Sequence, residues 1–182
     1  MSVSGVKRLV FKKIVKGDRR KFEAASNDTP SGGGARDLRF SPYHEFLKVF
    51  QRMLPNEDSG NFSGNISWVA DPVTNKVVSK NNSFYPPTSA RPNEGRLIQV
   101  HKNLPVTLLP PEEEGDAILV ILQNDDSQTW AFYTTEHSLL NDDWNEQVKS
   151  FILEAINAKR PVNSTAMGYV DYEHHESFYN GK

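Results

Sequence analysis

The chain has 182 residues with 23 Asp/Glu against 21 Lys/Arg, and it contains no cysteine. This length suits one domain with a core of its own, and the missing cysteines exclude disulfides and thiolate-metal sites. No apolar run approaches the roughly 20 residues that cross a bilayer, and residues 1–10 lack the apolar centre of a signal peptide. We therefore expect a cytoplasmic protein.

The charges are unevenly distributed along the chain. Residues 1–54 carry twelve Lys/Arg and five Asp/Glu, and residues 76–102 carry five and one. Residues 112–154 carry eleven acidic residues and a single lysine. This separation predicts a molecule with one basic face suited to a polyanion, with intermixing of the charges on folding as the alternative.

The chain begins with a strand pattern over residues 6–15, VKRLVFKKIV, which predicts a strand with one face in water. Residues 26–37 follow, and their three consecutive glycines and short polar side chains are typical of a loop whose backbone can approach a ligand. Arginines and lysines flank this loop, so it could be a simple turn or a loop that reaches phosphates and base edges.

Residues 42–54 show apolar side chains at helical spacing and predict a short amphipathic helix, with Ser41 as its N-cap and Pro42 at its first position. Short strand patterns then follow, and the last two are joined by a predicted hairpin turn at residues 124–127. These predicted strands are residues 65–70, 76–80, 96–101, 117–123 and 129–134.

Residues 86–96 form a proline-stiffened loop before one of these strands. Arg91, Asn93, Glu94 and Arg96 in this loop resemble a base-reading set, because arginine can bond guanine, asparagine adenine, and glutamate the cytosine amino group. A surface Arg-Glu pair without a function is the alternative interpretation.

The end of the chain contains a second predicted helix, which begins after an Asn-Asp-Asp cap at residues 141–143 and stops near Lys159. Its buried stripe would include Trp144, Val148 and Ile152. Residues 161–182 show little periodicity and are predicted to be a tail or linker, or an added edge strand. We place the main domain at residues 1–160. The pattern as a whole predicts a mainly β fold with two helices, an open or distorted β-barrel with a helix at each end.

The order of these features resembles the amino-terminal effector domain of EcoRII-type restriction endonucleases, which is related to the plant transcription-factor DNA-binding pseudobarrel. The resemblance runs over residues 6–158 and implies a seven-stranded pseudobarrel whose two loop arms grip double-stranded DNA and read a short sequence. The chain departs from the family at Ala35-Arg36 and in its proline-rich second arm, so the resemblance does not imply that the same DNA sequence is read. By position, the resemblance implies DNA contacts from the first-arm residues Arg20, Ser26, Asn27, Asp28, Thr29, Gly33, Gly34, Ala35 and Arg36, and from the second-arm residues Arg91, Asn93, Glu94 and Arg96.

The leading hypothesis is therefore sequence-specific recognition of double-stranded DNA, either by a standalone binder or by the targeting module of a restriction endonuclease whose nuclease domain lies outside this chain. Phosphate contacts that fix the register would come from basic residues outside the base-reading set, from Lys7, Lys12, Lys13, Arg19 or Lys80.

Two alternatives come from other classes. One is a small metal-dependent nuclease centred on Asp116 with residues 112–114, although no acidic-x-lysine pair follows on the next predicted strand. The other is a β-barrel that binds an acidic protein partner. His174-His175 has acidic neighbours, but adjacent side chains point apart in regular structure. We predict no catalytic residue, cofactor or metal in this chain.

Overall fold

The structure is a computed structural model that describes residues 5–26, 37–71, 76–100, 109–111, 115–162 and 164–181. The described residues form ten strands and four helices, so the protein is mainly β, but the predicted count of seven strands and two helices is wrong. Two compact units are present, unit 1 with residues 1–15 and 109–182 and unit 2 with residues 16–108. The predicted boundary at residue 160 differs from this division because the first strand of the chain pairs with strands from its end.

Unit 1 contains an antiparallel sheet with the strand order β10-β9-β1-β7-β8. The hairpin β7–β8 was predicted with its turn, and β7 is buried along nearly its whole length, as expected for a central strand that is apolar on both faces. The strands are β1 (Val6–Lys13), β7 (Ala117–Asn124), β8 (Thr129–Thr135), β9 (Met167–Asp171) and β10 (Glu176–Tyr179).

Strand β1 does not have the face in water that its lysines predicted. It lies between β7 and β9, and Arg8 and Lys12 are each only 5% exposed. Leu9 and Phe11, which alternate with them, are buried in the core on the other face. The alternation of charged and apolar residues therefore does not mark a solvent face here, since an interior strand can bury a basic side chain that finds partners.

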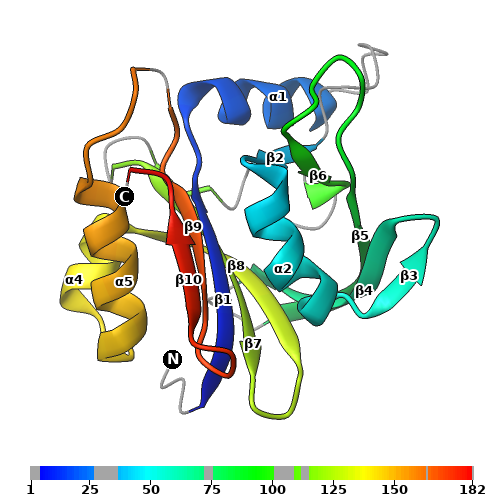
Figure 1. Cartoon of the computed structure of the whole chain (residues 1–182). Helices are drawn as coiled ribbons and strands as arrows, with labels where there is room; N and C mark the ends of the chain where they lie inside the picture. Colours follow the sequence, from blue (N-terminus) through cyan, green and yellow to red (C-terminus); the bar gives the residue numbers. More distant parts are fainter. Residues whose placement is uncertain are drawn as a thin grey trace. The chain divides into compact units, whose positions relative to one another are not determined.

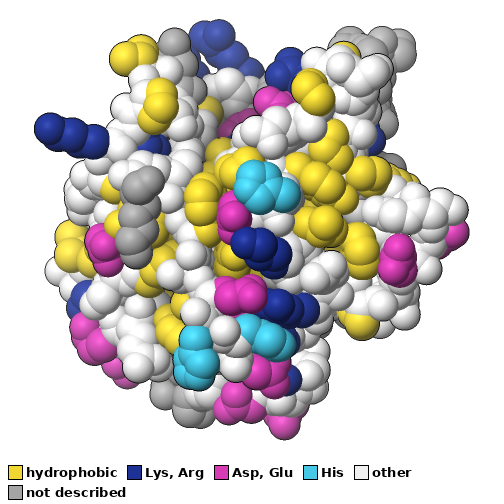
Figure 2. All heavy atoms as spheres, viewed as in Figure 1, with side chains coloured by type: hydrophobic (Ala, Val, Ile, Leu, Met, Phe, Trp, Pro, Cys, Tyr) yellow, Lys and Arg dark blue, Asp and Glu magenta, His cyan; other side chains and the backbone are white. Residues whose placement is uncertain are grey.

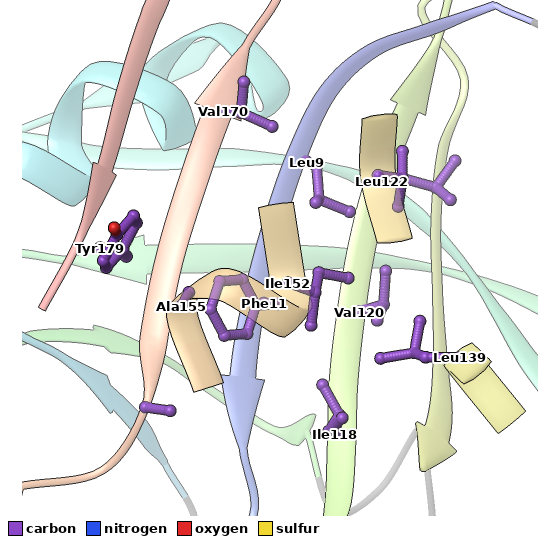
Figure 3. Packing of buried hydrophobic residues seen from close by; sticks show 12 residues of the cluster. Leu9, Phe11, Ile118, Val120, Leu122, Leu139, Ile152, Ala155, Val170 and Tyr179 are labelled. Carbon is purple, nitrogen blue, oxygen red and sulfur yellow. The ribbon is translucent and has the colours of Figure 1, made fainter. Parts of the chain in front are cut away.

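The core of unit 1 lies between this sheet and helices α4 (Glu136–Asn141) and α5 (Glu146–Asn157). Figure 3 shows Phe11 and Val120 of the sheet facing Ile152 and Ala155 of α5. The predicted stripe of α5 is confirmed for Val148 and Ile152, which are buried, whereas Trp144 precedes the helix and is half-buried.

The cap of α5 differs from the prediction, and the short helix α4 before it was not predicted. Asn145 caps α5, because its side chain accepts hydrogen bonds from the backbone N–H groups of Gln147 and Val148 at 3.0 and 3.2 Å. Asn141, the predicted cap, instead ends α4, whose own cap is Thr135. The sequence Asn-Asp-Asp therefore marks the connection between two helices and not the start of one.

The end of the chain is part of this sheet and is neither a tail nor a linker. β9 pairs with β1 over five residue pairs, and β10 pairs with β9. In Figure 1 the orange strand β9 lies beside the blue strand β1, and the red strand β10 lies on the other side of β9. The predicted alternative, an added edge strand, is correct for β10, which lies at the edge of the sheet. β9 instead lies inside the sheet, between β10 and β1.

Unit 2 contains a second run of antiparallel strands in the order β3-β4-β5-β6-β2. The long β4–β5 hairpin covers two of the predicted strands and extends both. The predicted strand 96–101 is only three residues long. The strands are β2 (Leu38–Phe40), β3 (Asn56–Asp58), β4 (Asn61–Asp71), β5 (Lys76–Tyr85) and β6 (Gly95–Leu97).

Helix α2 (Tyr43–Met53) closes the core of unit 2, as its periodicity predicted. Phe46 and Phe50 are fully buried and contact Phe40 and Phe84, with ring centroids of Phe50 and Phe84 4.2 Å apart. The N-cap is Pro42 and not Ser41, and it makes no side-chain capping hydrogen bond.

Helix α1 (Lys16–Ser26) was not predicted. Its residues are mostly charged or small, and Phe22, 1% exposed, is its one buried large apolar residue. A single apolar residue gives no helical period, so the sequence offered no signal in this stretch. Among the described residues no helix has both the length and the apolar character needed to span a membrane.

Candidate nucleic-acid interface

Most of the first predicted arm lies outside the described residues. Asn27, Asp28, Thr29 and residues 31–36, which include Gly33, Gly34, Ala35 and Arg36, belong to this part of the chain. Arg20 is exposed on helix α1, and Ser26 is the last residue of that helix. The predicted loop arm is therefore preceded by a helix instead of by an extended segment.

The second arm, residues 86–96, has a defined backbone. A turn places the N–H of Arg91 2.9 Å from the carbonyl of Thr88, and the N–H of Tyr43 donates to the carbonyl of Asn93 at 2.9 Å. The latter bond satisfies the first N–H of helix α2, which no residue of the helix itself can do. The second arm is thereby fixed to the start of α2.

Glycine at position 95 allows the arm to pass close to the aromatic core. A Cβ atom there would lie 2.2 Å from Phe84 Cζ and 2.9 Å from Tyr43 Cδ2. Burial around Tyr43 also raises the pKa of its hydroxyl above the ordinary value. The arm therefore reaches the sheet at a point where no larger residue fits.

Two arginines face each other where the arm enters the sheet. Arg39 on β2 lies directly opposite Arg96 on β6. Like charges at opposed positions repel, and two carboxylates offset this repulsion. Glu94 accepts from Arg39 at 3.0 Å, and Asp37 lies 3.8 Å from Arg96. Arg96 also stacks over the ring of Tyr85, with its guanidinium carbon 5.6 Å from the ring centroid.

Glu94 makes a further contact, with Arg91 of the same loop at 3.4 Å. Its carboxylate thus contacts two arginines, and its side chain is 29% exposed. Residues 88–93 are the exposed part of the arm, and Arg91 and Asn93 are the two among them with a guanidinium or amide side chain. The arrangement favours Arg91 and Asn93 as residues that reach a ligand, and Glu94 as the residue that orients the arginines.

Sequence reasoning missed the role of Arg39. The prediction placed it at the rim of the glycine-rich loop, whereas the β2–β6 pairing brings it to the second arm. Each of these strands has only three residues, too few to reveal their pairing in the sequence. The arginine cluster, defined here as Arg39, Arg91 and Arg96, therefore depends on tertiary pairing.

The lysines predicted to contact phosphates have varied surroundings. Lys12 is 5% exposed, so the prediction is wrong for this residue. Lys7 pairs with Glu173 at 2.9 Å and Lys13 with Asp116 at 2.7 Å, both inside unit 1. Lys80 is exposed on β5, and Arg19 is half-buried on α1.

A buried polar network crosses three strands of unit 1. Arg8 lies between Asp171 on β9 and Gln123 on β7, and it donates to Asp171 at 2.9 Å and to Gln123 at 2.6 Å. Asp171 is fully buried and also accepts from the backbone N–H groups of Glu173 and His174 at 3.1 Å. Both oxygens of the buried Asp171 carboxylate therefore accept hydrogen bonds, as a buried charge requires.

Asp171, Glu173 and His174 place potential ligand atoms within 4.8 Å of one another. Two basic side chains already contact this cluster, because Glu173 forms ion pairs with both Lys7 and Arg8. The hydrogen bond from Lys7, followed by the charge of Arg8, holds the pKa of Glu173 below its usual 4.5 despite some burial. Figure 2 shows acidic, basic and histidine side chains together near the β9–β10 turn. We interpret the cluster as an ion-pair network.

The alternative nuclease centre receives no support from a carboxylate cluster in the described part of the chain. Asp116 pairs with Lys13 and belongs to no group of three potential metal ligands there. Residues 112–114 lie outside the described residues. Neither a protein-family model nor a curated protein matches this sequence.

Proposed function

We propose that this protein recognises a short sequence in double-stranded DNA through the second arm, residues 86–96, together with the glycine-rich segment 26–36. The observation that supports this proposal is the arginine cluster. β2, β6 and the turn at residue 91 bring three guanidinium groups together with the exposed Asn93 in one small region of unit 2. Arginine and asparagine are the side chains that bond guanine and adenine bidentately in the major groove.

The charge of unit 2 agrees with such a partner. Residues 16–108 carry thirteen Lys/Arg and nine Asp/Glu, a net charge of +4, although the whole chain has a net charge of −2. A local positive field attracts phosphates and fixes the register, while the base contacts give sequence preference.

Selection of the full chain against a randomised duplex library tests the proposal. Enrichment of one motif is the expected result, and no enrichment at any salt concentration contradicts it. Arg91→Ala should then lose about tenfold or more of the discrimination at one base position. Lys159→Ala removes one exposed positive charge from unit 1 and serves as the matched control, with base preference unchanged.

The same purified protein distinguishes the alternatives. Plasmid incubated with the chain and magnesium should be retarded without being cut. Cleavage that Asp116→Asn abolishes would instead identify the nuclease. Binding that depends on salt but is equal for all duplexes would indicate a surface for an acidic partner, because charge alone carries no sequence information.

A further inference from the structure

A pocket of about 410 Å³ opens at one end of the unit 1 sheet. This volume lies within the range of small-molecule sites. The pocket involves none of the residues of the two arms proposed for DNA recognition. Its lining combines three apolar side chains with four polar ones. The polar side chains are Lys13, Asp116, Glu136 and His137, the apolar ones are Ile118, Leu140 and Ile156, and Gly115 completes the lining.

The apolar side of the pocket is continuous with the core. Ile118 is 1% exposed, and Figure 3 shows it at one end of the buried cluster, near Leu139 of α4. Leu140, the next residue, is 54% exposed and is one of three exposed large hydrophobic residues in the described part of the chain. A ligand with a short hydrocarbon chain could therefore cover apolar surface that faces water.

The polar side has an excess of negative charge. Lys13 and Asp116 form an ion pair of 2.7 Å and so neutralise each other. Glu136 is exposed, and the described residues include no ion-pair partner for it. Unit 1 as a whole carries eight Lys/Arg and fourteen Asp/Glu, a net charge of −6. These charges favour a cationic ligand over an anionic one.

His137 adds a hydrogen-bonding group. The side-chain amide of Asn141 lies 3.2 Å from Nδ1 of His137 and also donates to the His137 carbonyl at 2.8 Å. Asn141 thus contacts both the ring and the backbone carbonyl of His137 and orients the imidazole, which lines the pocket.

We propose that this pocket binds a primary alkylammonium ion, with the ammonium group at Glu136 and the alkyl chain against Leu140 and Ile156. n-Butylammonium is a suitable probe, and we expect a dissociation constant on the order of 1 mM, as for other very small ligands. Each added CH₂ that reaches the apolar wall should tighten binding by about two- to fourfold.

Titration of the full ¹⁵N-labelled chain, followed by NMR, tests this proposal. Amide signals of residues 115–118 and 136–140 should shift with n-butylammonium more than with 1-butanol, its neutral isostere. Glu136→Gln should weaken binding by about fivefold, the range of an exposed charge interaction. Glu146→Gln is the matched control, since Glu146 also begins a helix in unit 1 but lies outside the pocket, and it should leave the affinity unchanged.

Three outcomes would overturn the proposal. Binding of 1-butanol as tight as that of the ammonium ion would show that charge has no role. Tighter binding of butyrate would make Lys13 and His137 the recognising groups. An equal loss of affinity in both glutamine variants would indicate attraction to the net charge of unit 1 and no defined site.

Discussion

At the scale of single residues, Glu94 changes the interpretation of the second arm. The sequence suggested that its carboxylate reads a cytosine amino group, whereas the structure places it against Arg39 and Arg91. A carboxylate between two arginines holds them in place and also lowers the local positive charge. Its removal should therefore affect general affinity and selectivity in opposite directions.

Replacing Glu94 by Gln should raise the affinity for non-specific duplex DNA by about threefold to tenfold, because one negative charge is lost beside the phosphates. The ratio of specific to non-specific affinity should fall. Fluorescence anisotropy with a selected and a scrambled duplex, each at several salt concentrations, measures both. Unchanged binding to both duplexes would show that Glu94 lies away from the DNA.

Arg8 shows the other use of a basic residue in this protein. It is buried beside Asp171, and the two residues are 163 positions apart in the sequence. Asp171→Asn should lower the free energy of unfolding by about 3–5 kcal/mol, because the buried charge of Arg8 then keeps only Glu173, whose side chain is 44% exposed, as a carboxylate partner. Urea denaturation measures this change.

The ion pair between Lys149 and Glu146 provides the comparison for that variant. Its atoms lie 3.2 Å apart, but the side chain of Glu146 is 78% exposed. Lys149→Ala should therefore lower the free energy of unfolding by less than about 1 kcal/mol. Similar losses of unfolding free energy for Asp171→Asn and Lys149→Ala would show that the buried pair contributes no more to stability than an exposed one.

At the scale of elements, Gly168 tests whether the end of the chain is built into the sheet. A Cβ atom on Gly168 would lie 2.6 Å from the carbonyl oxygen of Phe178 and 2.9 Å from Phe11 Cε1. Gly168→Ala should therefore cost about 1–3 kcal/mol, since backbone cannot move aside easily. Thermal unfolding followed by circular dichroism gives the effect.

Gly17→Ala is the matched control for the same substitution. Gly17 lies in the first turn of α1, and an added Cβ would meet no atom within 4 Å. Alanine should be neutral there or stabilise by up to about 1 kcal/mol. A Gly168→Ala variant as stable as Gly17→Ala would mean that residues 161–182 do not pack as the β9–β10 hairpin.

At the scale of the whole molecule, the ion pairs predict how stability depends on pH. The pKa of Glu173 is lowered in the folded protein, chiefly by the hydrogen bond from Lys7. The unfolded chain therefore binds a proton at higher pH than the folded one. The contribution of Glu173 to stability is complete above its ordinary pKa of 4.5 and disappears as the pH falls through the lower, folded value.

Urea midpoints measured from pH 7 to pH 3 check this prediction. Glu173→Gln should reduce the loss of stability on the acid side, because the group that takes up the proton is gone. Lys7→Met should also reduce it by removing the first cause of the lowered pKa. If the urea midpoint falls by the same amount between pH 7 and pH 3 in the wild type and in both variants, the ion pair between Lys7 and Glu173 is not the cause of the acid sensitivity.

The distribution of charge also belongs to this scale. The sequence predicted a basic half and an acidic half, and within unit 1 the two kinds of charge intermix. Lys7, Arg8 and Lys13 on β1 each contact a carboxylate from the later part of the chain. The positive excess is found in unit 2, which also carries the arginine cluster.

The sequence by itself determined the elements that carry a local signal. The apolar spacing of residues 42–54, and of the stretch that follows residues 141–143 and ends near Lys159, predicted α2 and α5, and the turn between two strand patterns predicted the β7–β8 hairpin. Trp68, in the predicted strand 65–70, is fully buried with its indole N–H bonded to Asn82, and Trp130 and Trp144 pack partly buried against the core of unit 1. Helices and tight hairpins depend on residues that are close together in the sequence, and so their pattern can be recognised in the sequence alone.

Only the tertiary structure decided which charged residues are buried and which lie together. The pairing of β9 with β1 buries Arg8 beside Asp171, and the three-residue pairing of β2 with β6 sets Arg39 opposite Arg96. The pocket around Glu136 likewise needs β1, β7, α4 and α5 at once. These contacts join residues far apart in the chain, and the composition of one segment carries no information about the distant segment that will cover it.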